Sequence, residues 1–438
     1  MNRRDFVICC TGLLAGAAAP RSWAGKRKLG EKKRYEFRPY LEGKRLAPVT
    51  QVTPSGGHYI HTYYDVCPFS PSSRLLAVTR LPFADRPPVL GDLADVCVID
   101  LEDQTIRTVY RTKCWGFQTG ANLQWGATDR HLYTNDVFED VAVCVRIDLE
   151  TGETRAYAGP KYEIAPDESA VFGFPLELLD VTQPGYGVPP KAPGRFRKLP
   201  PGASKTEGVW RTDLKTNEKT LLVSLADVAA RIPEPPPRDG GTFYFWHTKV
   251  NPQGTRILQV LRCLFPDGSG GRNAMVFTYA MDGSDIRYTP SRPVWGLSGG
   301  HPNWHPDGEH IIRVLPVEGG KLRFCQFRWD GSGFRVLSET IEGGGHPRIE
   351  PGGRFLVTDA FPRIEGRQHV ALRLVRFDEE RVEDICVLPT VDRDHIEHMV
   401  LRLDGHPAWS RDFKKVIFQA APAGERQLFI ADLTDLIT

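Results

Sequence analysis

The sequence lacks the motifs that mark common metal and redox sites. None of its nine cysteines forms a Cys-x-x-Cys pair, and no His-Glu-x-x-His segment is present. It therefore indicates no thiolate zinc site and carries no strict metal signature. Neither sign of charge is in excess, because 56 Lys and Arg residues offset 54 Asp and Glu residues. The net charge of +2 gives no reason to expect nucleic acid or an anionic membrane as a partner.

Long hydrophobic runs are also missing, except near the N-terminus, where the run is too short to span a bilayer comfortably. Residues 1–24 have the pattern of an export signal, in which Arg3 and Arg4 precede an apolar stretch and Ala24 offers a cleavage point. The Arg-Arg pair resembles a twin-arginine signal, and a Sec signal that happens to contain it is the alternative. We expect a periplasmic or secreted mature protein with no membrane span, in which residues 25–44 form a basic linker.

Cysteine is sparse outside that signal. Seven cysteines remain, well separated and in strand-like segments. An odd number in such positions favours buried thiols over a disulfide framework. One or two disulfides are the alternative in an oxidising compartment.

A repeat fills most of the chain. Each copy has an x-Pro-Asp-Gly turn or a degenerate form of it, an alternating strand, and a second alternating strand, and seven copies follow one another from residue 67. Alternation predicts sheets, and the Asp-Gly and Thr-Gly pairs predict hairpin turns. A single copy cannot bury its faces, whereas radially stacked copies can. The sequence predicts an all-β, seven-bladed β-propeller over residues 45–438, with residues 45–53 adding a strand to the last blade.

Other structure should be limited. Residues 224–232 are the best candidate for a short helix, and the Pro-rich stretches 187–202 and 232–241 are expected to be surface insertions.

Histidine recurs at one position of the repeat. When the copies are aligned on the Pro of the turn, the fifth residue before it is, in order, Val66, Asn122, Lys161, His247, His301, His346 and His406. In a propeller this strand is normally the innermost, so four imidazoles should converge at one mouth of the central channel. For any one His, a turn preference is the alternative. His305 lies at the turn itself and is expected to face water.

A cluster of imidazoles is costly unless it binds something or shares protons. Imidazole with oxygen co-ligands suits Mn, Zn, Fe or Ni, and Asp404 and Glu350 are weak candidates for those oxygens. We expect a divalent metal at His301, His346 and His406.

Further polar residues are expected at the same mouth. The segment GGHYIHTYYDVC brings His58, His61, Tyr63, Tyr64 and Asp65, with a merely polar leading loop as the alternative. Asn122 and Gln124 begin an inner strand. We predict that His58, Tyr64, Asn122 and Gln124 bind substrate.

The strands HPNWHPDG and HPAWS resemble those of oligogalacturonate lyase and its relatives among propeller-fold polysaccharide lyases. The specific part is the combination of VWRTDL, WHTKVNP, GGHPNWHPDG and DGHPAWS, since Pro-Asp-Gly blades alone also occur in TolB-type propellers. The segment HYIHTYYD is similar to propeller lyases that act on ulvan or rhamnose–glucuronate linkages. The substrate therefore stays open.

The resemblance implies β-elimination of a uronic-acid glycan, with a divalent metal, typically Mn, held by His and Gln. It matches His301 and His406 to metal ligands, His247 to the proton-abstracting base and Arg211 to an active-site Arg. The family's Gln and further His before the last His-Pro are replaced in this chain by Leu401 and Asp404. Either His346 or Asp404 completes the shell, or metal binding is lost.

The leading hypothesis is an exported lyase of uronate-containing oligosaccharides. A neutral His removes the proton α to the carboxylate, whose charge the metal or an Arg neutralises, and Tyr or a second His, such as His61, protonates the leaving oxygen. Mn is the expected ion, with Ca or Zn as alternatives. The other functional hypotheses are a non-catalytic TolB-like propeller that binds a glycan or protein at the mouth, and a metal-dependent hydrolase or lactonase.

Overall fold

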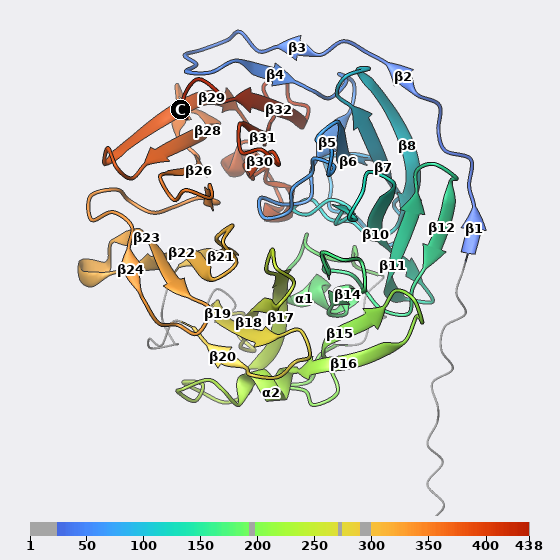
Figure 1. Cartoon of the computed structure of the whole chain (residues 1–438), viewed down its shortest axis with the longest axis vertical. Coiled ribbons are helices and arrows are strands. Elements are labelled where there is room, and N and C mark those ends of the chain that lie inside the picture. Colours follow the sequence, from blue (N-terminus) through green and yellow to red (C-terminus); the bar gives the residue numbers. More distant parts are fainter. Residues whose placement is uncertain (1–23, 192–197, 270–273, 290–298, 438) are drawn as a thin grey trace, which may run out of the picture.

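The chain forms seven antiparallel sheets arranged in a ring (Figure 1). The computed structural model describes residues 24–191, 198–269, 274–289 and 299–437, so the expected export signal lies outside the described residues except for Ala24. The predicted all-β, seven-bladed β-propeller is confirmed.

Within each blade the strands follow one another from the centre of the ring outward. Blade 1 contains β5 (His58–Ile60), β6 (Leu75–Leu81), β7 (Ala94–Asp100) and β8 (Thr105–Thr112). Blade 2 contains β9 (Gln124–Trp125), β10 (His131–Phe138), β11 (Val141–Asp148) and β12 (Glu153–Ala156). Blade 3 contains β13 (Glu163–Ile164), β14 (Ala170–Gly173), β15 (Gly208–Asp213) and β16 (Lys219–Ser224). Blade 4 contains β17 (Thr242–Val250), β18 (Arg256–Leu264), β19 (Met275–Ala280) and β20 (Arg287–Tyr288).

The remaining blades follow the same order. Blade 5 contains β21 (Gly300–Trp304), β22 (His310–Pro316), β23 (Leu322–Arg328) and β24 (Arg335–Val336). Blade 6 contains β25 (Arg348–Ile349), β26 (Phe355–Ala360), β28 (Arg367–Arg376) and β29 (Arg381–Pro389), with β27 (Arg363–Ile364) paired to β28. Blade 7 contains β30 (Ala408–Trp409), β31 (Lys415–Ala420), β32 (Gln427–Asp432), β4 (Val49–Gln51) and β3 (Arg38–Pro39).

Both ends of the chain build blade 7. β4 pairs with β32, which closes the ring as predicted. The residues before it, expected to be a basic linker, run along the outer rim, where β3 pairs with β4, β2 (Lys33–Arg34) with β8, and β1 (Ala24–Lys26) with β12 (Figure 1). This segment thereby covers strand edges of three consecutive blades that would otherwise be unpaired.

Alternating side chains pack each blade against both neighbours. In β6, Leu76 and Val78 pack with Ile417 of blade 7, whereas Ala77 packs with Leu132 of blade 2. This is the consequence of a period of two in a sheet with two buried faces. The core is therefore a ring of inter-blade layers, which leaves the channel ends to polar residues.

Helices are short. α2 (Leu225–Ala229) lies in the predicted segment and begins at Ser224, which forms a capping box with Asp227. The others are α1 (Leu179–Thr182), η1 (Leu176–Leu178), η2 (Glu318–Gly320), η3 (Arg393–His395) and η4 (Met399–Leu401). Among the described residues, no helix combines the length and hydropathy needed to cross a membrane. The seven cysteines of this region are free thiols, and six are buried, as predicted.

Candidate functional site

The repeat position that carries histidine has its own backbone geometry. Asn122, His247, His301 and His406 all have positive φ angles, between 46° and 63°. A side chain with a Cβ rarely adopts this region, so its recurrence shows that the aligned positions are structurally equivalent. The pairing of β17 with β18 also shifts register around His247. Such bulges re-aim a side chain, and here the side chain turns towards the channel axis.

Tyr63 occupies the centre of the histidine cluster. The segment after β5 crosses the channel and buries the Tyr63 ring. Its ring centroid lies 5.0 Å from that of His247, 5.7 Å from that of His346 and 4.4 Å from that of His406. Three of the four aligned histidines therefore contact one tyrosine.

The fourth histidine joins through Tyr64 and His346. The Tyr64 ring lies 5.7 Å from His301 and 5.2 Å from His346, and the two imidazoles are 4.2 Å apart. The His346 ring is 4.5 Å from that of His406. The structure thus brings together all four histidines of the repeat position, and Tyr64 packs among them.

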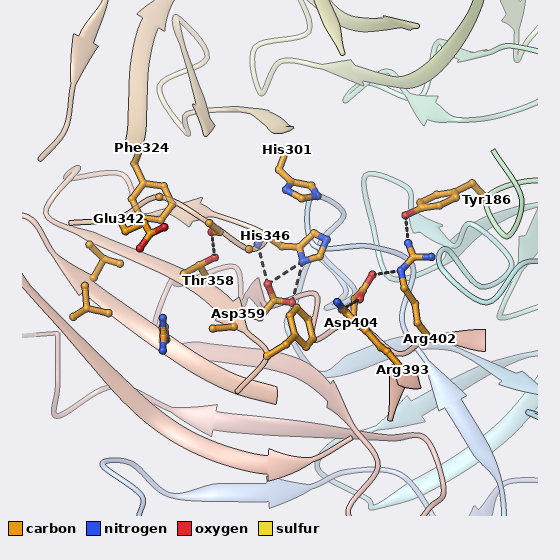
Figure 2. A pocket seen from close by; sticks show the side chains of 18 residues that line it. Tyr186, His301, Phe324, Glu342, His346, Thr358, Asp359, Arg393, Arg402 and Asp404 are labelled. Atoms are coloured by element: carbon orange, nitrogen blue, oxygen red, sulfur yellow. Dashed lines mark hydrogen bonds and ion pairs between the residues drawn. The ribbon is translucent and has the colours of Figure 1, made fainter. Parts of the chain in front are cut away.

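Asp359 orients His346. Both Asp359 oxygens lie 2.9 Å from Nδ1 of His346, and the carboxylate also accepts the backbone N–H groups of His346 and His406 (Figure 2). Although burial opposes the charge, the facing His346 and these hydrogen bonds hold the pKa of Asp359 below its usual value. With Nδ1–H donating to Asp359, the lone pair of His346 Nε2 is free to bind a metal.

Gln419 plays the same part for His406. Its amide nitrogen Nε2 lies 3.0 Å from His406 Nδ1, whereas His406 Nε2 and Gln419 Oε1 are buried without a partner. The oxygen and nitrogen of an amide have nearly the same shape and can be interchanged. Burial, with the neighbouring His346 adding to it, lowers the pKa of His406 well below its usual value. When the amide presents Oε1 to Nδ1–H, the Nε2 lone pair becomes free as well.

Asp404 supplies an oxygen beside these two imidazoles. Its Oδ2 lies 3.8 Å from His406 Nε2, and ligand atoms of His346, Asp404 and His406 all lie within 4.8 Å of one another. Arg402 Nε donates to Oδ2 at 3.0 Å and Arg393 Nη2 donates to Oδ1 at 2.5 Å. Two imidazoles and a carboxylate at this spacing suit one divalent ion.

Two of the candidate ligands, His346 and Asp404, border a cavity of about 680 Å³, and His406 is buried beside them. Its other lining residues include His301, Asp359, Arg393, Arg402 and Tyr186 (Figure 2). Tyr186 belongs to the insertion between β14 and β15, and its hydroxyl accepts from Arg402 Nη2 at 2.9 Å. The cavity lining therefore combines two of the candidate ligands with three guanidinium groups, those of Arg373, Arg393 and Arg402.

The two residues assigned by resemblance to the base and the active-site Arg lie outside this cavity lining. His247 is only 2% exposed, is stacked on Tyr63, and has its Nδ1 bonded to the Tyr162 hydroxyl. Burial, and the nearby Lys249 in addition, lower its pKa well below the usual value. Arg211 lies in the third strand of blade 3, where its guanidinium is 3.3 Å from Asp213. The structure does not bring Arg211 to the histidines.

His58 and His61, from the segment GGHYIHTYYDVC, differ in their surroundings. His61 is fully buried, its ring centroid is 6.5 Å from that of His406, and neither nitrogen has a hydrogen-bond partner. Burial lowers the pKa of His61 to about 4. His58 lies in β5, and its Nδ1 accepts a hydrogen bond from the backbone N–H of Arg426 at 3.3 Å. Neither residue lines the cavity.

Four polar residues lie elsewhere than the sequence predicted. Gln124 lies in a second cavity, because two residues along an inner strand move a side chain from the histidine end of the channel towards the other. Asn122 donates to the Lys161 carbonyl and is likewise absent from the first cavity. His305 does not face water, since it is 7% exposed and its Nδ1 accepts the backbone N–H of Asp307. Glu350 caps its own turn by accepting the Arg354 N–H.

The sequence contained an unused signal for the orienting residues. Asp359 and Gln419 each lie 13 residues after the histidine they contact. Each is a buried polar residue in the second strand of its blade. The shared spacing of 13 residues therefore links each orienting residue to its histidine. No such spacing identifies Tyr186 or Arg402, which lie in loops.

Comparisons with known proteins bear on the fold. No family model matches the chain, and no curated protein matches its sequence. An oligogalacturonate lyase from Vibrio parahaemolyticus superposes with a TM-score of 0.67 at 15% identity, covering 93% of this chain and 100% of that one. The chain has the fold of oligogalacturonate lyase.

A second structure, of an oligogalacturonate lyase in complex with manganese, gives a TM-score of 0.66 at 16% identity, over 92% of this chain and 97% of the other. TolB from Acinetobacter baumannii is more distant, with a TM-score of 0.38 and 12% identity over 77% of this chain and 64% of that one. The likeness to the two lyases extends over nearly the whole ring. It concerns the architecture, and the chemistry has to be argued from the site.

Proposed function

We propose that the protein is a metal-dependent lyase that cleaves uronate-containing oligosaccharides by β-elimination. The observation that carries the proposal is the cluster of His346, His406 and Asp404, in which Asp359 and Gln419 contact the two imidazoles. His346 and Asp404 border the first cavity. Oriented imidazoles with free Nε2 atoms are typical of metal ligands. The fold shared with an oligogalacturonate lyase in complex with manganese supports the same conclusion.

The donor set suits Mn²⁺, and Zn²⁺ is an alternative that the same ligands can bind. A divalent ion at this place supplies positive charge that stabilises the carboxylate of a uronate as its α-proton is removed. Arg393 and Arg402 keep the Asp404 carboxylate in place and add positive charge to the same wall. These residues favour an anionic sugar over a neutral one.

His301 is the imidazole best placed to move the proton. It lines the first cavity, whereas His247 is buried behind Tyr63. His301 is also not one of the three candidate metal ligands, which are His346, Asp404 and His406. Burial and the adjacent His346 lower the pKa of His301 well below its usual value, which keeps it neutral. The hydroxyl of Tyr186, which faces the cavity beside Arg402, is the matching donor for the leaving oxygen.

Two single variants separate the candidate bases. His301→Ala should lower kcat by about 100-fold or more, the usual contribution of a positioned base. His247→Ala should lower it less, because that ring contacts aromatic residues rather than the cavity. Steady-state kinetics on one uronate oligosaccharide, with circular dichroism to check folding, gives both numbers. If kcat fell more in His247→Ala than in His301→Ala, His247 rather than His301 would be the base.

The proposed reaction is tested on the product. Purified protein, with its metal content measured, is incubated with a panel of uronate oligosaccharides, and the ultraviolet absorbance of an unsaturated product is followed. Product mass distinguishes the alternatives, because hydrolysis adds water and elimination does not. Saturable binding of these glycans without any product would instead support a non-catalytic propeller. We also propose that the protein is exported by the N-terminal signal, which places it where such glycans are found.

A further inference from the structure

The channel has a second cavity of about 530 Å³ at its other mouth. On the inner strand of blade 5, His301 borders the first cavity, whereas Asn303 and Trp304 border the second. On that of blade 6, His346 borders the first cavity and Arg348 borders the second. Tyr64 lies between the two, with its ring 5.2 Å from His346 and its hydroxyl accepting from Lys249 Nζ at 3.4 Å. The second cavity is therefore separate from the proposed catalytic site.

Among the described residues, two of the three cations that line this cavity form no ion pair. Lys249 is neutralised by Asp65 at 2.7 Å, and its Nζ also donates to the Pro302 carbonyl at 2.6 Å. Arg411 donates to the Phe69 carbonyl. In the part of the chain that the structure describes, the Arg348 side chain has no hydrogen bond or ion pair, and its Nε is buried. Leaving a buried Nε–H without a partner is costly. The charge of Asp65 favours the Arg348 cation, but that carboxylate is paired with Lys249, so a further anion would stabilise Arg348.

The rest of the lining suits a sugar. The indole N–H groups of Trp125 and Trp304 are used internally, by the Pro68 and Lys249 carbonyls, so these residues offer the cavity only ring surface. Gln124 and Asn303 add side-chain amides, and Gln124 Oε1 is buried without a partner. Aromatic surface contacts the C–H face of a pyranose, and amides bond to its hydroxyl groups.

We propose that this second mouth binds a monosaccharide-sized carboxylated sugar, with Arg348 as the bidentate anchor of the carboxylate. A guanidinium matches a carboxylate in geometry, which a point charge does not. The site is a binding site without chemistry of its own. It stands independently of the proposed lyase reaction, because it uses none of the residues of the first cavity.

The test is calorimetric titration of the full-length mature protein in EDTA, so that a metal in the first cavity cannot bind the probe. D-galacturonate and D-glucuronate are the probes, with D-glucose and inorganic phosphate as comparison ligands. We expect saturable uronate binding and at least about tenfold weaker binding of glucose, because glucose lacks the charged partner of Arg348. No uronate binding, or phosphate binding as tight as that of uronate, would overturn the proposal.

Matched variants locate the site. Arg348→Gln should weaken uronate binding by about tenfold or more, and Arg348→Lys by less, because Lys keeps the charge but loses the paired geometry. His406→Ala, outside the lining of the second cavity, should leave the affinity unchanged. Thermal unfolding checks each variant, and if Arg348→Gln does not fold, Arg348→Lys carries the test. Unchanged affinity in a folded Arg348 variant would refute the assignment, whereas a failure of the lyase proposal would show as absent elimination with this binding intact.

Discussion

His406→Ala is expected to abolish both elimination and metal binding. The substitution removes one of three ligand atoms that lie within 4.8 Å of one another. Metal stabilisation of the developing charge is worth several kcal/mol, so we expect kcat to fall by about a thousandfold, which corresponds to roughly 4 kcal/mol. Initial rates at saturating Mn²⁺, followed by the unsaturated product, measure this loss.

Metal binding has a readout that does not depend on activity. Mn²⁺ that binds the folded state should raise the unfolding temperature of the unmodified protein and leave that of His406→Ala unchanged. His305→Ala is a matched control, because His305 is also a buried histidine but bonds within its own turn. It should keep the Mn²⁺ response. A His406→Ala protein that still gained stability from Mn²⁺ would contradict the proposed ligand set.

Asp65→Asn is expected to destabilise the protein by about 3–5 kcal/mol, the usual cost of leaving a buried charge without its partner. Asp65 and Lys249 form an ion pair at 2.7 Å whose side chains are 5% and 4% exposed. Burial lowers the pKa of Lys249 even with Asp65 opposing it, so the ammonium depends on this carboxylate. Urea unfolding of both proteins measures the difference.

The double variant Asp65→Asn, Lys249→Met is the control. It removes both charges and replaces the lysine stem with an apolar side chain of similar length, so it should recover most of the lost stability. Equal stability of the single and double variants would show that the pair is not the cause.

Glu163 predicts how stability depends on pH. Burial raises the pKa of Glu163 to about 7, although the Gln124 hydrogen bond and the nearby Lys161 oppose this. In the unfolded state this carboxyl has its ordinary pKa of about 4.3. At pH values between the unfolded and the folded pKa, the folded state therefore binds more protons than the unfolded state. The stability that this proton provides is present below the unfolded pKa and is lost as the pH rises through about 7.

The measurement is urea unfolding at several pH values beside Glu163→Gln, which keeps the shape without the titration. The unmodified protein should lose stability relative to the variant between about pH 4 and pH 7, that is, between the unfolded and the folded pKa of Glu163. Parallel curves across this range would show that Glu163 does not titrate as the structure indicates.

The repeat predicted the architecture because it is a local property. Strand alternation, the turn motif and the position of His301 within it recur in each copy, so alignment alone located four histidines that the folded ring brings together. The same alignment predicted closure through residues 45–53, since a ring of sheets leaves one edge to be filled.

The alignment predicted the blade of a residue more reliably than the end of the channel to which its side chain belongs. Gln124 is two residues beyond the aligned position, and that step places it in the other cavity. Arg211 was assigned by resemblance, but it lies in a strand outside the inner one and pairs with Asp213. Tyr186 and Arg402 come from insertions without a period, so their meeting follows only from the folded chain.

Closure by β4 and β32 also has a consequence for the order of folding. Thr53 accepts the backbone N–H of Leu428, a residue 375 positions away. The strand β4 is synthesised early, but its partner β32 is synthesised only when the chain is almost complete. Pairing over such a separation is slow, and until it forms, an apolar strand edge stays open to other chains. Concentration during refolding, more than the strength of any single contact, should therefore decide how much of this protein reaches its native ring.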